Sequence, residues 1–149
     1  MSNDFDDHHN EAERTPATAL TAALDDGKTH LLLAASGSVA VVKLPLIISS
    51  LVHYPNLSIR VILTQNAARF LTGQSPEQPT VAFLSALPNV DAVYQDEHEW
   101  AEPWKRGANI LHIQLRRWSH LLVVAPLTAN TLDKVSGGFC CGPPLNFSR

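Results

Sequence analysis

Several features that would assign a protein to a class are scarce in this sequence of 149 residues. It has only two cysteines, Cys140 and Cys141, and because they are adjacent they indicate neither a disulfide framework nor a metal site. No apolar run reaches the roughly 18 residues that a membrane-spanning helix needs. The formal net charge of −3 provides no basic surface for nucleic acid. We therefore expect a cytoplasmic protein that binds neither membranes nor nucleic acid.

The composition that remains is typical of one globular domain. Hydrophobic residues make up 45% of the chain and charged residues 17%, and a chain of this length can bury a substantial core. Residues 1–29 are acidic and polar, with little to bury, and predict a disordered tail. The folded domain is expected to span residues 30–140.

Apolar strands alternate with helices along this domain. Strands are expected at residues 30–35, 57–64, 92–94 and 120–125. Helices are expected from the first turn to about residue 53 and at residues 67–71, 110–118 and 129–136. The alternation predicts an α/β fold with a parallel sheet that is covered on both faces.

Two segments carry more specific expectations. Pro45 predicts a kink or a restart in the first helix. The apolar residues of that helix are expected to face the core; they are Val39, Val42, Leu46 and Leu51. Residues 96–107, which are rich in charge and contain Trp100 and Trp104, predict a surface loop.

Small polar residues follow three of the strands, at residues 36–38 (SGS), 64–66 (TQN) and 128–130 (TAN). Ligands of parallel α/β sheets bind at the carboxyl ends of the strands, and free amides at a helix start attract phosphate. Together the three turns predict a nucleotide site, although each alone is also explained as a helix cap.

The first two turns restrict which nucleotide could bind. A dinucleotide site needs three spaced glycines and an acidic residue after the second strand, whereas this chain has Gly37 alone and the neutral Thr64 and Gln65. A mononucleotide phosphate at the amides of Gly37, Ser38 and Val39 fits better, and FMN meets that description.

His112 is the best candidate for chemistry. It lies near the start of the helix at 110–118, where the helix dipole disfavours a charged imidazole and leaves a neutral ring suited to proton transfer. The alternative from local sequence is a histidine that packs beneath its helix. Arg116 and Arg117 are more typical of a solvated face or an interface than of a site for a substrate anion.

Three motifs resemble those of the flavin-dependent cysteine decarboxylases, at residues 34–40 (AASGSVA), 111–118 (LHIQLRRW) and 125–132 (APLTANTL). Residues 96–100 (DEHEW) and 134–138 (KVSGG) are similar to the same family. Within it, the likeness is to phosphopantothenoylcysteine decarboxylase and its halotolerance-protein relatives. It runs in order through the whole expected domain.

The resemblance implies a Rossmann-like, three-layer α/β/α flavoprotein that binds FMN and assembles as a trimer. It implies that His112 is catalytic. The implied flavin contacts are Gly37, Ser38, Val39, Thr64, Gln65, Asn66, Thr128, Ala129, Asn130 and Thr131. The implied reaction converts phosphopantothenoylcysteine into 4′-phosphopantetheine on the route to coenzyme A. FMN oxidises the substrate thiol, carbon dioxide is lost, and the reduced flavin returns its electrons.

The resemblance ends after residue 140. Family members continue with another helix and strand, a Pro-x-Met-Asn motif and a cysteine-containing flap, whereas residues 141–149 (CGPPLNFSR) match none of these. We therefore expect the last strand and helix of the family fold to be missing and apolar surface to be open at residues 121–124. Poor solubility, or activity only in a mixed trimer with a full-length relative, would follow. A splice variant or a mistaken gene model would explain the change.

Two other functions are compatible with the same core. Fungal halotolerance relatives inhibit a protein phosphatase, and they carry long acidic extensions, whereas the acidic tail here is short and favours the enzyme. A related flavin-binding decarboxylase or prenyltransferase is the third possibility, and the motif at residues 111–118 argues against it.

Overall fold

The computed structural model describes residues 20, 24–99, 106–107 and 110–138. Predictions for most of the N-terminal tail, for Trp100 and Trp104 and for Cys140 and Cys141 lie outside these residues. Within the described part of the chain, no helix is long and apolar enough to cross a membrane.

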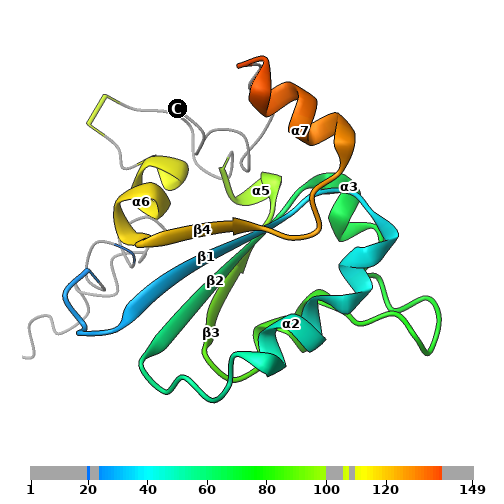
Figure 1. Cartoon of the computed structure of the whole chain (residues 1–149), viewed down its shortest axis with the longest axis horizontal. Coiled ribbons are helices and arrows are strands. Elements are labelled where there is room, and N and C mark those ends of the chain that lie inside the picture. The colour runs from blue at the N-terminus through cyan, green and yellow to red at the C-terminus, as the bar shows by residue number, and fades with distance from the viewer. Residues whose placement is uncertain (1–19, 21–23, 100–105, 108–109, 139–149) are drawn as a thin grey trace, which may run out of the picture.

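The described residues contain four strands, which form one parallel sheet in the order β3-β2-β1-β4 (Figure 1). The strands are β1 (Thr29–Ala35), β2 (Leu57–Leu63), β3 (Val90–Tyr94) and β4 (Leu121–Val124). The chain moves outward from β1 to β3, then crosses back to place β4 on the other side of β1. The predicted parallel α/β fold is confirmed, with β3 and β4 as the edge strands.

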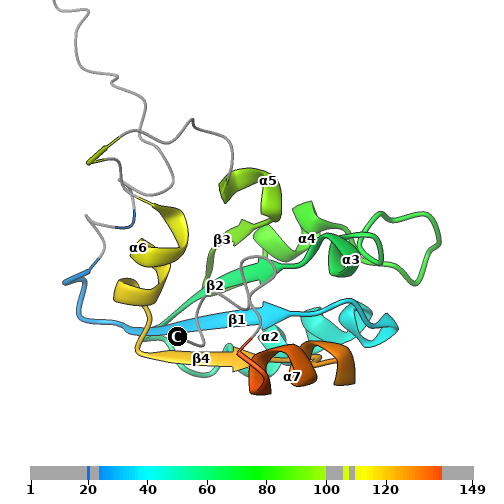
Figure 2. The same ribbon diagram turned by 90° about the horizontal axis from the view of Figure 1, so that it is seen from above.

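Helices cover both faces of this sheet. They are η1 (Val39–Lys43), α2 (Leu44–Ser50), α3 (Gln65–Ala68), α4 (Val81–Ser85), α5 (Asp96–Glu99), α6 (Leu111–Trp118) and α7 (Ala129–Ser136). Figures 1 and 2 show α2 on one side of the sheet and α5 and α6 on the other. Buried apolar side chains form one cluster beneath α2 and α4 and a second beneath α6. This two-sided burial explains why the strands are almost continuously apolar.

The predicted restart at Pro45 is confirmed, because a 3₁₀ helix ends at Lys43 and α2 begins at Leu44 with proline in its first turn. The predicted core face was wrong at Val39 and Leu46, whose exposed fractions are 68% and 71%. A 3₁₀ helix has three residues per turn rather than 3.6, so a single helical period across the junction misplaces the inward face. The buried residues are instead Val41, Leu44 and Ile48.

Two further expectations need correction. Leu20 is fully buried in the cluster beneath α6, so the expected tail contacts the core at this residue. Residues 96–99 form the helical turn α5 rather than a loop, and this turn packs against α6. In both cases the segment packs against α6 or against the apolar cluster beneath it.

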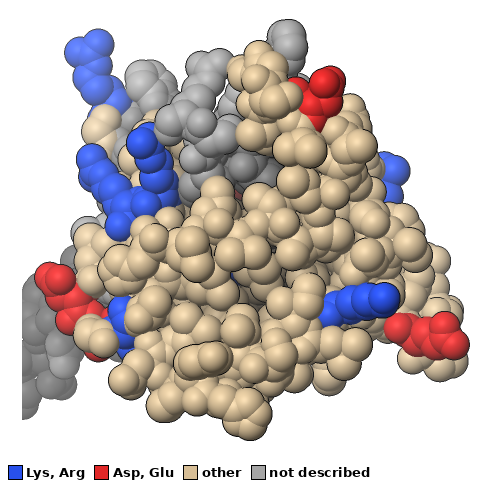
Figure 3. Space-filling view, viewed as in Figure 1, with Lys and Arg blue, Asp and Glu red and all other residues tan. Residues whose placement is uncertain are grey.

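The edge strand β4 exposes apolar side chains, as predicted. Leu121 and Val123 are 57% and 37% exposed, and Leu127 and Leu132 just beyond the strand are also exposed. Figure 3 shows few charged side chains on this face where it lies over β4. The described residues therefore leave an apolar surface along one edge of the sheet.

A buried polar cluster fixes the C-terminal end of α6. His30, at the start of β1, stacks between the rings of Trp118 (4.4 Å between centroids) and His120 (4.8 Å). The Arg60 guanidinium lies 4.7 Å from the Trp118 ring centroid and donates to the Tyr94 hydroxyl (2.6 Å). Burial raises the pKa of Tyr94, and the nearby Arg60 charge partly offsets this. These contacts tie α6, which carries His112, to three strands of the sheet.

Candidate functional site

The three polar turns lie together at the carboxyl edge of the sheet. Strand β1 lies between β2 and β4, and all three run parallel, so the turns that follow them end at the same edge (Figures 1 and 2). Strands β2 and β3 are added on one side of β1 and β4 on the other, so the order of the strands switches between β1 and β4. Open α/β sheets bind ligands at such a switch point, so the topology supports the predicted position of the site.

Gly37 brings the first turn against the second. A Cβ atom built on Gly37 would lie 2.5 Å from the Cβ of Asn66, which is closer than real Cβ contacts allow. Thr64 adds a backbone link, because its amide donates to the carbonyl of Ala35 (3.1 Å). The glycine is therefore required for close approach of the two turns rather than for a left-handed backbone.

Ser36 joins the first turn to the third. Its side chain is buried, and its hydroxyl donates to the carbonyl of Pro126 (2.9 Å) while accepting from the amide of Thr128 (2.8 Å). The Ser36 amide donates to the same carbonyl (3.1 Å). These bonds hold the two turns together at the switch point, a role of Ser36 that the local sequence does not indicate.

We expect Ser36→Ala to lower the free energy of unfolding by about 1–3 kcal/mol, because the Thr128 amide loses its acceptor and the Pro126 carbonyl loses one of its two donors. Urea unfolding measures the change. Ser50→Ala is the matched control, since the Ser50 hydroxyl donates to a carbonyl at an exposed position. Equal stability of the two variants would contradict the bridging role of Ser36.

Each of the three turns begins a helix with a hydroxyl cap. Ser38 accepts from the amide of Ala40 (3.3 Å), Thr64 from that of Ala67 (3.1 Å) and Thr128 from that of Thr131 (3.3 Å). The Ser38 amide donates within the turn, to the carbonyl of Ser36 (2.8 Å). Of the three amides predicted to hold a phosphate, the Ser38 amide is thus already engaged in this structure.

The predicted site residues differ in exposure. Gly37, Ser38, Thr64, Thr128 and Thr131 are half-buried. The other predicted site residues are exposed; they are Val39, Gln65, Asn66, Ala129 and Asn130. We call these ten residues the polar crest; their hydroxyl, amide and backbone groups are of the kinds that bind a phosphate or a polar ring edge.

His112 lies on α6 and is hydrogen-bonded to Glu99 of α5. Its Nδ1 lies 2.6 Å from Oε1 of Glu99, and its backbone amide donates to Oε2 of the same carboxylate (3.2 Å). The His112 side chain is 29% exposed and that of Glu99 only 7%. Glu99 is not recognisable from local sequence as the partner of His112, because 13 positions separate the two residues.

A second carboxylate lies near this pair. Burial raises the pKa of Asp96, and the negative charge of Glu99 raises it further. Asp96 therefore takes up a proton more readily in the folded chain than a free aspartate does.

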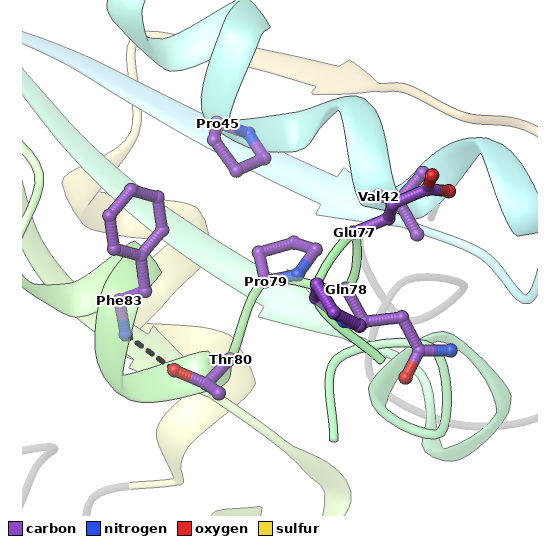
Figure 4. A pocket seen from close by; sticks show the side chains of 8 residues that line it. Val42, Pro45, Glu77, Gln78, Pro79, Thr80 and Phe83 are labelled. Atoms are coloured by element: carbon purple, nitrogen blue, oxygen red, sulfur yellow. Dashed lines mark hydrogen bonds between the residues drawn. The ribbon is translucent and has the colours of Figure 1, made fainter. Parts of the chain in front are cut away.

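A separate hollow of about 440 Å³ lies between α2 and the loop that precedes α4 (Figure 4). Pro45 and Phe83 form apolar walls, and Glu77 contributes the one charged side chain of its lining. The lining contains none of the predicted site residues. The hollow therefore does not coincide with the polar crest.

Comparison with known proteins places this geometry in a family. A family model described as Flavoprotein matches residues 20–147. Phosphopantothenoylcysteine decarboxylase of Mus musculus is 42% identical over 117 residues, which cover 78% of this chain and 50% of that protein. This chain thus spans about half the length of that relative.

Solved structures agree with the sequence match. A mutant phosphopantothenoylcysteine decarboxylase complexed with pantothenoylaminoethenethiol is 38% identical, with a TM-score of 0.67 over 82% of this chain and 60% of that one. The FMN-binding protein AtHal3 is also 38% identical, with a TM-score of 0.65 over 82% of this chain and 59% of that one. The chain therefore belongs to the flavoprotein family, with phosphopantothenoylcysteine decarboxylases and Hal3 proteins among its relatives.

Proposed function

We propose that this chain is the FMN-binding part of a phosphopantothenoylcysteine decarboxylase, which forms 4′-phosphopantetheine in coenzyme A biosynthesis. The observation that carries the proposal is the convergence of three capped turns at the switch point of the sheet, joined by Ser36 and by the contact between Gly37 and Asn66. The decarboxylases among its relatives support this function over the phosphatase-inhibiting alternative.

The residues present fit FMN. The absence of a side chain at Gly37 leaves the first two turns close enough to contact one ligand, and hydroxyls at Ser38, Thr64 and Thr128 supply polar groups around it. We assign the phosphate to the turn of Gly37, Ser38 and Val39. The remaining contacts would come from Thr64, Gln65 and Asn66 and from Thr128, Ala129, Asn130 and Thr131. When bound, FMN supplies a reversible two-electron oxidation of the substrate thiol.

His112 is the proposed catalytic residue and exchanges a proton with the substrate. Its partly exposed ring is accessible, and the carboxylate of Glu99 orients it. Among the described residues, the hydrogen bonds of His112 are to Glu99 of α5 and to none of the three turns, and we propose that the complete site forms at a subunit interface. The assembly would be a cytoplasmic trimer, either of this chain alone or mixed with a full-length relative.

The test begins with bound flavin. The purified chain is expected to carry FMN, identified by its absorbance and mass, and Thr128→Ala is expected to lower the FMN content several-fold. Thr80→Ala is the matched control because Thr80 caps α4 with the same kind of bond, to the amide of Phe83 (3.0 Å, Figure 4), away from the crest. A folded chain that takes up no FMN, or equal FMN loss in both variants, would contradict the proposed site.

Activity is then measured as release of carbon dioxide from 4′-phosphopantothenoylcysteine. The chain is assayed alone and after co-expression with a full-length decarboxylase, and size-exclusion chromatography reports the assembly. Turnover in either assembly that depends on His112 of this chain supports the proposal. Bound FMN without such turnover would leave the flavin site standing and overturn the decarboxylase assignment.

A further inference from the structure

Glu99 contacts His112 through both of its carboxylate oxygens. Oε1 lies 2.6 Å from the ring Nδ1, and Oε2 accepts from the backbone amide of the same residue at 3.2 Å. The Glu99 side chain is only 7% exposed, so water competes weakly for either oxygen. One buried carboxylate therefore restrains both the ring and the backbone of His112.

This contact determines which ring nitrogen carries the proton. An ionised carboxylate only accepts hydrogen bonds, so Nδ1 must carry a hydrogen to bond Glu99. In the neutral ring Nε2 then has the free lone pair. Free histidine favours the opposite tautomer, with the hydrogen on Nε2, so removal of Glu99 is expected to reverse the assignment.

The carboxylate also completes the start of α6. Ile110 is the N-cap residue of this helix and has no side-chain oxygen, and Glu99 accepts from the amide two positions later in its place. Glu99 lies at the end of the turn α5, and the amide of Gln95, just before this turn, donates to Nδ1 of His98 within it (2.9 Å). The ring of His98 in turn packs edge-on against Tyr94 at the end of β3 (6.2 Å between centroids).

We propose that Glu99 is a positioning residue for His112, holding hydrogen on Nδ1 and leaving Nε2 as the atom that exchanges a proton with the substrate. This inference rests on the proposed function for its catalytic consequence. The tautomer itself is a property of the chain and is measurable without turnover.

The first measurement is side-chain ¹⁵N NMR of histidine-labelled protein, above the pH at which the rings are charged. The His112 signal is identified by its loss in His112→Asn. We expect hydrogen on Nδ1 in the unsubstituted chain and on Nε2 in Glu99→Ala. Glu97→Ala is the matched control, since Glu97 is an exposed carboxylate on the same turn. An unchanged tautomer in Glu99→Ala would overturn the inference.

The second measurement separates positioning from helix stability. Glu99→Ala is expected to lower kcat at least about tenfold, with a smaller change in KM, as second-layer partners of a functional histidine do. Adding Ile110→Ser supplies a local cap to α6, and this double variant is expected to regain Tm without regaining kcat. Recovery of both would make Glu99 a helix cap only and overturn the inference. Undiminished kcat in His112→Asn would instead overturn the proposed function, while the tautomer measurement still decides the role of Glu99.

Discussion

Replacement of His112 by asparagine is expected to lower kcat for decarboxylation by roughly 10²–10⁴-fold, the range for loss of a general acid–base group. Asparagine retains hydrogen-bonding capacity but cannot exchange a proton near neutral pH. The bound FMN is expected to remain, because the ring is hydrogen-bonded to Glu99 of α5, which lies outside the three turns. Product formation and flavin content per chain are measured on the same preparation.

The control for this variant is His53→Asn. His53 is an exposed histidine in the turn after α2, and its replacement is expected to leave both kcat and FMN content unchanged. If His112→Asn retained the kcat of the His53 variant, His112 would have no role in proton transfer. If it lost FMN, the ring would belong to the flavin site rather than to catalysis.

Replacement of Gly37 by alanine is expected to reduce FMN content several-fold and to destabilise the chain by about 1–3 kcal/mol, the usual cost of overpacking. The new Cβ would lie 2.5 Å from the Cβ of Asn66, so the first two turns must separate. Flavin content per chain and urea unfolding measure the two effects.

A second substitution tests this steric explanation directly. In Gly37→Ala with Asn66→Gly the clashing Cβ is gone, and the nearest remaining Asn66 atoms are backbone atoms at 3.4 Å and 3.5 Å, an ordinary contact distance. The double variant is therefore expected to be no less stable than Asn66→Gly alone. If the alanine cost the same with and without Asn66→Gly, close approach of these turns would not be the reason for the glycine.

Much of the site could be predicted because its parts are local. A hydroxyl that caps a helix and the strand that precedes it lie within a few residues of each other, so Ser38, Thr64 and Thr128 are recognisable from their neighbours. The failed predictions concern residues whose exposure depends on the exact helix geometry or on distant segments. Val39 and Leu46 follow an apolar pattern yet face solvent because the helix type changes at Lys43.

The sequence by itself determined the α/β class, the three turns and the candidate histidine, since strand patterns, caps and a histidine near a helix start are short-range features. Only the tertiary structure decided which turns are neighbours, through the strand order β3-β2-β1-β4. It also revealed that Ser36 bonds Pro126 and Thr128, which lie 90 and 92 positions further along the chain. It showed, too, that Glu99 is the partner of His112. Hydrogen bonds over such separations depend on how the strands and helices pack, and that packing is decided by the whole core.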